Sequence, residues 1–194
     1  MPGVLILGSS HVNHFKTFLK EENKLDFELQ PPVEIHLFGI SGGLISCSSH
    51  VRRLEEEIQT VQPDALIIHI GGNDLDDKEH EPTRVAETCQ LLVSVCDLFA
   101  TRYNLKLVTV IQLMPRQRTR HWDPELYNNR VIDFNRLLKT NMQDFEKLCY
   151  WNIAGIKNPQ EPIFKDGVHL NNLGQYKYYR NIRGAVLASL RALQ

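Results

Sequence analysis

The chain has 194 residues, of which 42% are hydrophobic and 23% are charged, close to the average of globular proteins. Its 22 basic and 23 acidic residues give a formal net charge of −1, which excludes a disordered chain and argues against the usual basic nucleic-acid-binding module. No uninterrupted apolar run approaches the roughly 18 residues of a membrane span, and the apolar run 4–7 is too short for a signal peptide. This length predicts one domain over residues 1–194.

Short apolar runs alternate with longer amphipathic ones along the chain. Strands are predicted at 4–7, 33–38, 65–70, 107–113 and, more weakly, 150–153. Helices are predicted between and after them, at 12–22, 44–61, 83–103, 124–148 and 173–193. Continuous apolar strands are typical of a sheet covered on both faces. The order therefore predicts a three-layer α/β/α sandwich with a five-stranded parallel sheet, of the flavodoxin-like kind.

Two further patterns concern polar and sulfur-containing residues. The acidic runs 55–57 and 76–77 are interpreted as solvated faces. The four cysteines (Cys47, Cys89, Cys96 and Cys149) form no Cys-x-x-Cys pair, and we interpret them as buried free thiols. Such thiols indicate a reducing compartment, so a cytoplasmic location is expected.

Small and polar residues follow three of the predicted strands and precede the last helix. The segments are Gly-Ser-Ser-His at 8–11, Gly-Ile-Ser-Gly-Gly at 39–43, Gly-Gly-Asn-Asp at 71–74 and Asp-Gly-Val-His-Leu at 166–170. Ligands of open α/β sheets bind beyond the carboxyl ends of the strands, so these segments are expected to meet at one edge.

Two of these segments admit more than one interpretation. Ser10 opens the first helix and is either its N-cap or part of a phosphate-binding turn, although neither common nucleotide-binding glycine motif is present. Asp166 and His169 are three residues apart. The carboxylate either orients the imidazole, as in a Ser-His-Asp triad, or caps the last helix beside a surface histidine.

A metal site is a further alternative for the histidines. The candidates besides His169 are His11, His14, His69 and His121, but no His-x-x-x-His pair with a glutamate is present. We therefore expect neither a metal nor any other cofactor.

The third segment adds donors that acyl transfer requires. A tetrahedral intermediate carries an oxyanion, which preorganised donors must stabilise. The side-chain amide of Asn73 can donate, and Gly42 can bring a backbone N–H close because no side chain intervenes. The N–H of Ser10 would be a third donor.

The four segments together resemble the SGNH, or GDSL-type, hydrolase family, which is named for Ser, Gly, Asn and His in four blocks. They occur in the family's order and spacing over almost the full chain. The resemblance implies Ser10 as the nucleophile, His169 as the base and Asp166 as its orienting acid. It also implies an oxyanion hole formed by Ser10, Gly42 and Asn73, and the same three-layer fold.

The first block departs from the family pattern, which has Asp before the nucleophile where this chain has Ser9. Since this serine can hydrogen-bond within the turn, we expect activity to persist. Residues 4–12 and 112–116 also resemble the esterase domains of the first-frame proteins of vertebrate LINE-type retrotransposons. That narrower resemblance implies a domain cut from a longer chain, self-association through regions outside it, and an acetylesterase acting on small or lipid-like esters.

The substrate pocket is expected between segments 75–78 and 116–122. Arg116, Arg118 and Arg120, with Trp122, could hold an anionic headgroup, or they could form an exposed basic loop. A short chain without a helical lid favours a small acyl group. The expected function is a serine esterase. The alternatives are a catalytically weak lipid- or partner-binding domain of a retrotransposon ribonucleoprotein, and a nucleic-acid-associated domain, whose direct binding of nucleic acid the net charge disfavours.

Overall fold

The computed structural model describes residues 3–30, 33–78 and 84–194, and all statements below concern these residues. Five parallel strands form one sheet in the order β2-β1-β3-β4-β5. They are β1 (Gly3–Gly8), β2 (Glu34–Gly39), β3 (Ala65–His69), β4 (Leu107–Ile111) and β5 (Leu148–Trp151). In this flavodoxin-like order, ligands bind beyond the carboxyl ends of the strands, near the switch between β1 and β3.

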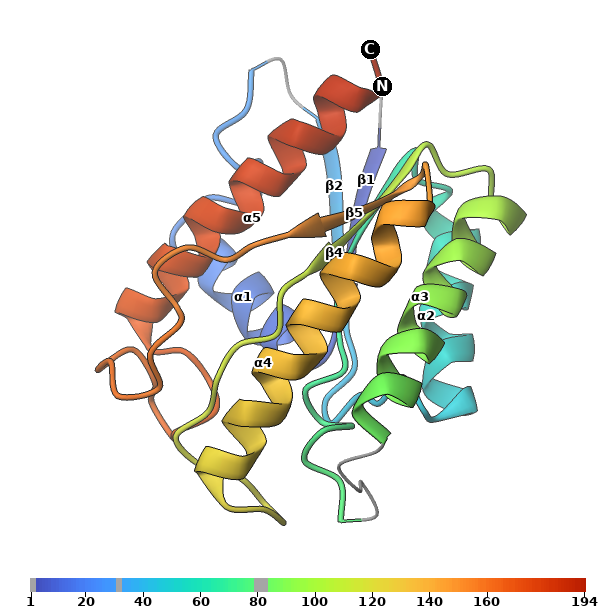
Figure 1. Ribbon diagram of the computed structural model, residues 1–194. Coiled ribbons are helices and arrows are strands. Elements are labelled where there is room, and N and C mark those ends of the chain that lie inside the picture. The colour runs from blue at the N-terminus through green and yellow to red at the C-terminus, as the bar shows by residue number, and fades with distance from the viewer. Residues whose placement is uncertain (1–2, 31–32, 79–83) are drawn as a thin grey trace.

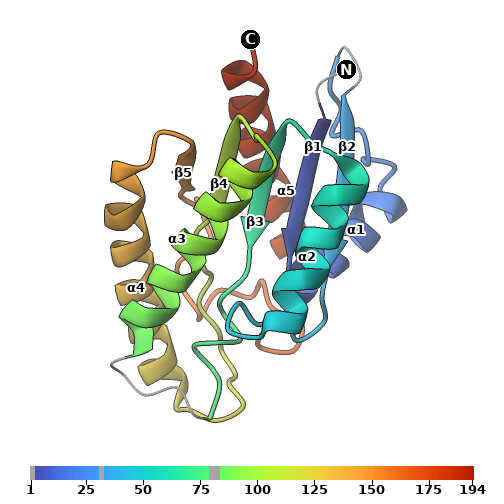
Figure 2. The same ribbon diagram turned by 90° about the vertical axis from the view of Figure 1, so that its right-hand side faces the viewer.

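Helices cover both faces of the sheet (Figures 1 and 2). One face carries α1 (Ser10–Glu21) and α5 (Asn172–Ala192). The other carries α2 (Ser48–Val61), α3 (Arg84–Arg102) and α4 (Pro124–Asn141), and a short 3-10 helix, η1 (Met142–Asp144), follows α4. This arrangement confirms the predicted α/β/α sandwich with its five-stranded parallel sheet.

The central strands are apolar without interruption because both of their faces are covered. Leu5 and Leu7 of β1 belong to the hydrophobic cluster under α2, α3 and α4, whereas Val4 and Ile6 belong to the cluster under α1 and α5. Successive residues of a strand point to opposite faces, so one apolar run supplies both clusters. The sheet is thereby fixed between its helices, and its carboxyl edge presents the polar loops.

Most predicted boundaries agree with the structure to within about two residues, but two helices differ more. The second predicted helix begins at Ser48 rather than at residue 44, because the N–H groups of residues 45 and 46 donate to the carboxylate of Asp74. The fourth ends at Asn141 instead of 148, and β5 begins at Leu148. Residue 83, the predicted start of the third helix, lies outside the described residues.

The interpretation of residues 76–77 as a solvated face is wrong for Asp76, which is 3% exposed. Its carboxylate lies 2.9 Å from the guanidinium of Arg116 and accepts the backbone N–H of Arg120 at 3.0 Å. A buried charge is tolerated when it is paired and hydrogen-bonded, as here. A charge run in sequence does not reveal such long-range partners.

The four cysteines are free thiols, and Cys89 and Cys96 are buried as predicted. The prediction is wrong for Cys47 and Cys149, which are only partly buried, because Cys47 lies in the loop before α2 and Cys149 in the edge strand β5. Burial raises the pKa of Cys89 to about 11, so this thiol is uncharged at neutral pH. None of the helices in the described part of the chain combines the length and the hydropathy of a membrane span.

Candidate active site

Ser10 is the first residue of α1, at the sharp turn that follows β1. A Cβ on Gly8 would lie 2.4 Å from the carbonyl oxygen of His69 and 2.6 Å from Val12 Cγ2, so only glycine allows this turn against β3. The N-cap of α1 is Ser9, whose side chain makes no capping hydrogen bond within the described residues. Ser9 holds the turn through its backbone N–H, which donates to the carbonyl of His69 at 3.1 Å.

The hydroxyl of Ser10 contacts His169, which is 159 positions further along the chain. Ser10 Oγ lies 3.0 Å from His169 Nε2, and His169 Nδ1 lies 2.7 Å from Asp166 Oδ2. With the carboxylate ionised, Nδ1–H donates to it, and Nε2 is left to accept the Ser10 hydroxyl proton. The order hydroxyl, imidazole, carboxylate is that of a Ser-His-Asp triad.

A small hairpin before α5 presents the Asp-x-x-His segment. Phe164 and Leu170 form an antiparallel bridge, and the N–H of Lys165 donates to the carbonyl of His169 at 2.8 Å. Gly167 turns the chain with a φ of +85°, a conformation that side chains other than glycine rarely adopt. The hairpin thus fixes the backbone on both sides of the imidazole.

Asp166 uses its two oxygens for different purposes. Oδ1 accepts the backbone N–H groups of Val168 at 3.0 Å and His169 at 2.6 Å, which leaves Oδ2 for the imidazole ring. Partial burial raises the pKa of Asp166, but the hydrogen bonds from the ring and backbone of His169 and from Val168 outweigh it and hold the pKa well below its usual range. Asp166 does not cap α5, since the N-cap is Asn171, whose side chain accepts the N–H of Gly174.

The side-chain amide of Asn73 is fixed at both ends. Nδ2 donates to the carbonyl of Gly43 at 3.1 Å, and Oδ1 accepts from Arg116 Nη2 at 2.9 Å. Arg116 is only 5% exposed, and its Nη1 lies 2.9 Å from the Asp76 carboxylate. An amide nitrogen has two N–H groups, so one is left for a ligand after the bond to Gly43.

The loop around Gly42 is anchored beside Asn73. The N–H of Gly43 donates to the carbonyl of Ile40 at 2.9 Å, and Gly42 has a φ of +68° with nothing within 4 Å of an added Cβ. The carboxyl group of Asp74 accepts the N–H groups of residues 45 and 46. Burial raises the pKa of Asp74, although these hydrogen bonds oppose the shift. The two candidate oxyanion donors therefore belong to loops that hold each other.

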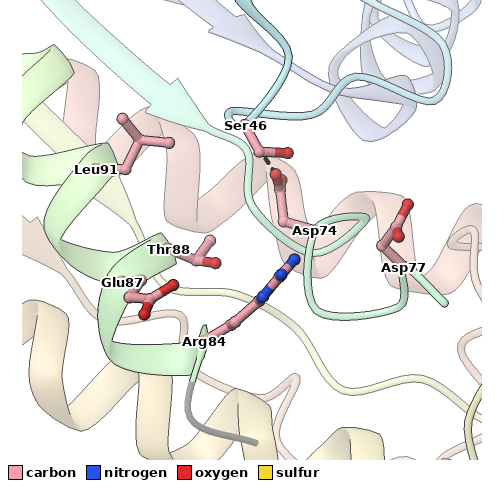
Figure 3. Close-up of a pocket in the computed structure, with 7 residues that line it drawn as sticks. All are labelled: Ser46, Asp74, Asp77, Arg84, Glu87, Thr88 and Leu91. Carbon is pink, nitrogen blue, oxygen red and sulfur yellow. Dashed lines mark hydrogen bonds between the residues drawn. The ribbon is translucent and has the colours of Figure 1, made fainter. Parts of the chain in front are cut away.

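A polar cavity of about 390 Å³ lies behind this anchored loop, between it and the start of α3 (Figure 3). Ser46 and Asp74 form one wall, and the side chain of Arg84 extends toward Asp74 from the first turn of α3 (Figure 3). Glu87, also in the first turn of α3, adds a negative charge to the lining of the cavity. The cavity is thus lined by charges of both signs and is not an apolar channel.

Three other histidines, His11, His14 and His69, form a cluster of rings with His169. The ring centroid of His169 lies 5.5 Å from that of His11 and 4.4 Å from that of His14, and His11 stacks on His69 at 5.6 Å. Burial lowers the pKa of His69 to about 4 and that of His11 well below its usual value. These two imidazoles are therefore neutral at neutral pH. No group of three or more His, Cys, Asp or Glu residues in the described chain is arranged to hold a metal ion.

The arginine-rich segment does not act as one exposed basic loop. Arg116 is buried and contacts Asn73, whereas Arg118 is exposed. The side chain of Arg118 lies against Gly167, since an added Cβ on Gly167 would be 2.8 Å from Arg118 Cγ. Trp122 is turned toward α4: its ring lies 4.0 Å from the guanidinium carbon of Arg130. Arg116 and Arg118 thus lie beside the candidate site, while Trp122 contacts the protein itself.

Sequence reasoning missed the role of the two acids behind Asn73. Asp74 anchors the Gly42 loop, and Asp76 anchors Arg116 and the segment after β4. The available signal was their position, because carboxylates that directly follow a buried parallel strand lie at the ligand-binding edge.

Several solved structures share the fold of this chain. The chain is similar to a GDSL-like lipase from Bacteroides thetaiotaomicron VPI-5482, with 19% identity, a TM-score of 0.69, and 96% and 88% of the two chains covered. It is also similar to a member of the lipolytic protein G-D-S-L family from Veillonella parvula DSM 2008 (14% identity, TM-score 0.70, 93% and 96% covered). A catalytic mutant of an acetylxylan esterase from Geobacillus stearothermophilus gives 16% identity and a TM-score of 0.64, with 93% and 92% covered. No curated protein matches the sequence significantly.

At these identities the likeness to solved structures concerns the fold, whereas a family model concerns the sequence itself. The family model that matches this chain extends over residues 10–177, from the first residue of α1 into α5, and so includes Ser10 and the three later sequence blocks in full. The narrower resemblance to retrotransposon esterase domains stays a prediction. The chain belongs to the GDSL-like lipase/acylhydrolase family.

Proposed function

We propose that this chain is a serine esterase that hydrolyses carboxylic esters with short acyl chains, among them acetyl esters of small or lipid-like alcohols. The observation that carries the proposal is the continuous hydrogen-bonded path from the Ser10 hydroxyl through His169 to Asp166, at 3.0 and 2.7 Å. The side-chain amide of Asn73, which is held by hydrogen bonds at both ends, adds an N–H donor for the oxyanion that would form beside Ser10.

In the first step His169 Nε2 takes the hydroxyl proton while Ser10 Oγ attacks the ester carbonyl carbon. The carbonyl oxygen becomes an oxyanion, which accepts from the N–H groups of Ser10 and Gly42 and from the Asn73 amide. Asp166 stays ionised and stabilises the imidazolium. The imidazolium then returns its proton to the alcohol oxygen as the carbon–oxygen bond breaks, which leaves an acyl group on Ser10.

In the second step the same imidazole activates water. The water oxygen attacks the acyl carbon, and a proton of the water passes to Nε2 of His169. That proton then moves to Ser10 Oγ as the bond between Oγ and the acyl carbon breaks. The acid leaves and the hydroxyl is restored. The cycle needs no redox change and no co-reactant except water.

A short acyl group fits the surroundings of the site. Cavities of about 390, 630 and 360 Å³ border the loops at this edge, and most of the side chains that line them are polar. A long hydrocarbon chain would require a predominantly apolar pocket. The likeness to an acetylxylan esterase makes acetyl the first acyl group to test, although that likeness concerns the fold.

A covalent probe tests the nucleophile directly. A fluorophosphonate is expected to add one phosphonyl group per chain, with loss of fluoride, and peptide mass spectrometry should place it on Ser10. Ser10→Ala should stay unlabelled, while the adjacent Ser9→Ala is the matched control and should label like the wild type. Labelling of Ser10→Ala to the same extent would contradict the assignment.

Turnover tests the reaction and the acyl preference. p-Nitrophenyl acetate, butyrate and octanoate are offered to the wild type and to Ser10→Ala, and p-nitrophenol release is followed. We expect kcat/KM to fall as the chain lengthens and Ser10→Ala to lose at least about 10³-fold. Equal turnover by both proteins would refute the esterase proposal.

A further inference from the structure

The hairpin that carries Asp166 and His169 is held by two parts of the chain. Its tip is bound to the segment after β4, because the carbonyl of Gly167 accepts the backbone N–H groups of Gln117 at 2.7 Å and of Arg118 at 3.1 Å. The hairpin also contacts α1, whose first residue is the proposed nucleophile. The distance between the nucleophile and its base therefore depends on how firmly the hairpin is held against α1.

His14 of α1 lies against the imidazole of His169. Ser10 and His14 are four residues apart in the helix, so their side chains project from the same face, one turn apart. The ring centroids of His14 and His169 are 4.4 Å apart, with 55° between the ring planes. Ser10 Oγ lies 3.0 Å from Nε2 of the same imidazole. The helix thus contacts the base at two points, through a hydroxyl and through a ring.

Lys165 connects His14 to the hairpin. It directly precedes Asp166 in the chain, and its Nζ lies 3.3 Å from His14 Nδ1. An ammonium group can only donate, so His14 Nδ1 must be the acceptor and must carry no proton. Partial burial lowers the pKa of His14, as do the neighbouring His169 and Lys165, although Asp166 opposes the shift. The ring of His14 is therefore in the neutral form that this bond requires at neutral pH.

The proposed triad is accessible to solvent. The side chain of Asp166 is 46% exposed and that of His169 is 23% exposed. Water competes for hydrogen bonds at such a position, so the bond between the two side chains restrains the imidazole less than it would in a buried triad. A second ring packed against the imidazole restrains it without depending on an exposed hydrogen bond.

We propose that His14 is a positioning residue for the esterase reaction: its ring holds the imidazole of His169 between Ser10 and Asp166, and Lys165 holds His14 in that orientation. The proposal rests on the proposed esterase function, and His14 itself takes no proton from the substrate. A displacement of about 1 Å can cost about 10²-fold in rate. A single hydrogen bond contributes much less, so the ring of His14 should matter more than its bond to Lys165.

Four variants separate the ring from its hydrogen bond. His14→Ala removes both, His14→Phe keeps a ring without an acceptor, and Lys165→Met removes the donor at an exposed position that carries little risk to folding. His36→Ala, which removes a partly exposed histidine from the edge strand β2, is the matched control.

Two rates are measured for each variant, and urea denaturation checks that the fold is retained. One is the turnover of p-nitrophenyl acetate, which gives kcat and KM. The other is the rate constant for labelling of Ser10 by a fluorophosphonate. This reaction releases fluoride and no alcohol, so it reports the activation of the hydroxyl independently of alcohol binding.

We expect His14→Ala to lower kcat about 10- to 100-fold and the labelling rate by a similar factor, with KM changed less than about 2-fold. His14→Phe and Lys165→Met should each lose only about 2- to 5-fold. Their double variant should lose no more than either alone, because both changes remove the same hydrogen bond. His36→Ala should stay within about 2-fold of the wild type.

The outcomes distinguish this proposal from the proposed function. If the wild type cleaves the ester but His14→Ala keeps its kcat and labelling rate, or is impaired only in KM, His14 does not position the base and the esterase proposal stands. A loss in His14→Phe as large as that in His14→Ala would also refute the role of the ring.

If the wild type neither cleaves the ester nor is labelled, the esterase proposal fails, and the role of His14 is judged by NMR. The low-field proton signal of His169 Nδ1–H, assigned by its loss in Asp166→Asn, reports whether the imidazole is held against the carboxylate. It should persist in His14→Phe and be broadened or lost in His14→Ala. Identical signals in the wild type and His14→Ala would refute the proposal.

Discussion

Replacing Arg116 by lysine tests whether its buried guanidinium orients the side-chain amide of Asn73, the proposed oxyanion donor. One arm of the guanidinium lies 2.9 Å from the Asp76 carboxylate and the other 2.9 Å from Asn73 Oδ1. Lysine keeps the positive charge beside Asp76, so that this buried carboxylate is not left unpaired. A single ammonium cannot reproduce the planar fork, however, and Asn73 loses the contact that fixes which end of its amide faces the Gly42 loop.

The size of the effect follows from the donor that is disturbed. Removing one oxyanion donor typically costs about 10²–10³ in kcat, or about 3–4 kcal/mol, and that value is expected for Asn73→Ala. Arg116→Lys leaves the amide present and its bond to Gly43 intact. We therefore expect a smaller loss in kcat, about 10- to 100-fold. KM should change little, because the interaction is made in the transition state.

The assay is a double-mutant cycle with p-nitrophenyl acetate. If Arg116 acts through Asn73, Arg116→Lys in the Asn73→Ala background should lower kcat by less than about 3-fold further. Urea denaturation of each variant checks that the fold is retained. A loss that is equally large in both backgrounds, or full activity of the single variant, would refute a positioning role for Arg116.

Three other predictions concern the triad and the packing around it. Asp166→Asn should lower kcat by about 10³–10⁴-fold without unfolding the protein, because the imidazole loses its orienting carboxylate; unchanged kcat would contradict the triad. The pKa of His69 is lowered to about 4, so below about pH 6.5 the unfolded chain binds a proton that the folded protein does not, and stability falls as pH drops through this range. His69 Nδ1 lies 2.7 Å from the hydroxyl of Tyr178, and glutamine can keep a hydrogen bond to that hydroxyl. His69→Gln should therefore reduce the loss of unfolding free energy between pH 7 and pH 4 by about 3 kcal/mol, and a urea series with an unchanged pH dependence would oppose this. Gly8→Ala should destabilise the protein by about 1–3 kcal/mol, since its Cβ would meet the carbonyl of His69 at 2.4 Å, whereas the control Gly3→Ala, whose nearest neighbour lies at 3.8 Å, should be nearly neutral.

Local sequence patterns were sufficient to predict the layers of the fold and the edge of the sheet at which the candidate site lies. Uninterrupted apolar strands and amphipathic helices are local patterns, and a parallel sheet covered on both faces is the arrangement that buries them all. The glycine- and serine-rich blocks could be assigned to the carboxyl edge for the same reason. The resemblance then supplied the roles of Ser10, His169 and Asp166, which the spacing of the residues alone left open.

The pairing of side chains that are distant in sequence could not be predicted from local patterns and is known from the folded structure. The fold buries Asp76 against Arg116, uses Asp74 to delay the start of α2, and places Lys165 beside His14. A carboxylate or an amide has the same local sequence pattern whether it is solvated or buried. Its partners are set by the packing of whole helices and loops against the sheet, which a periodic pattern does not encode.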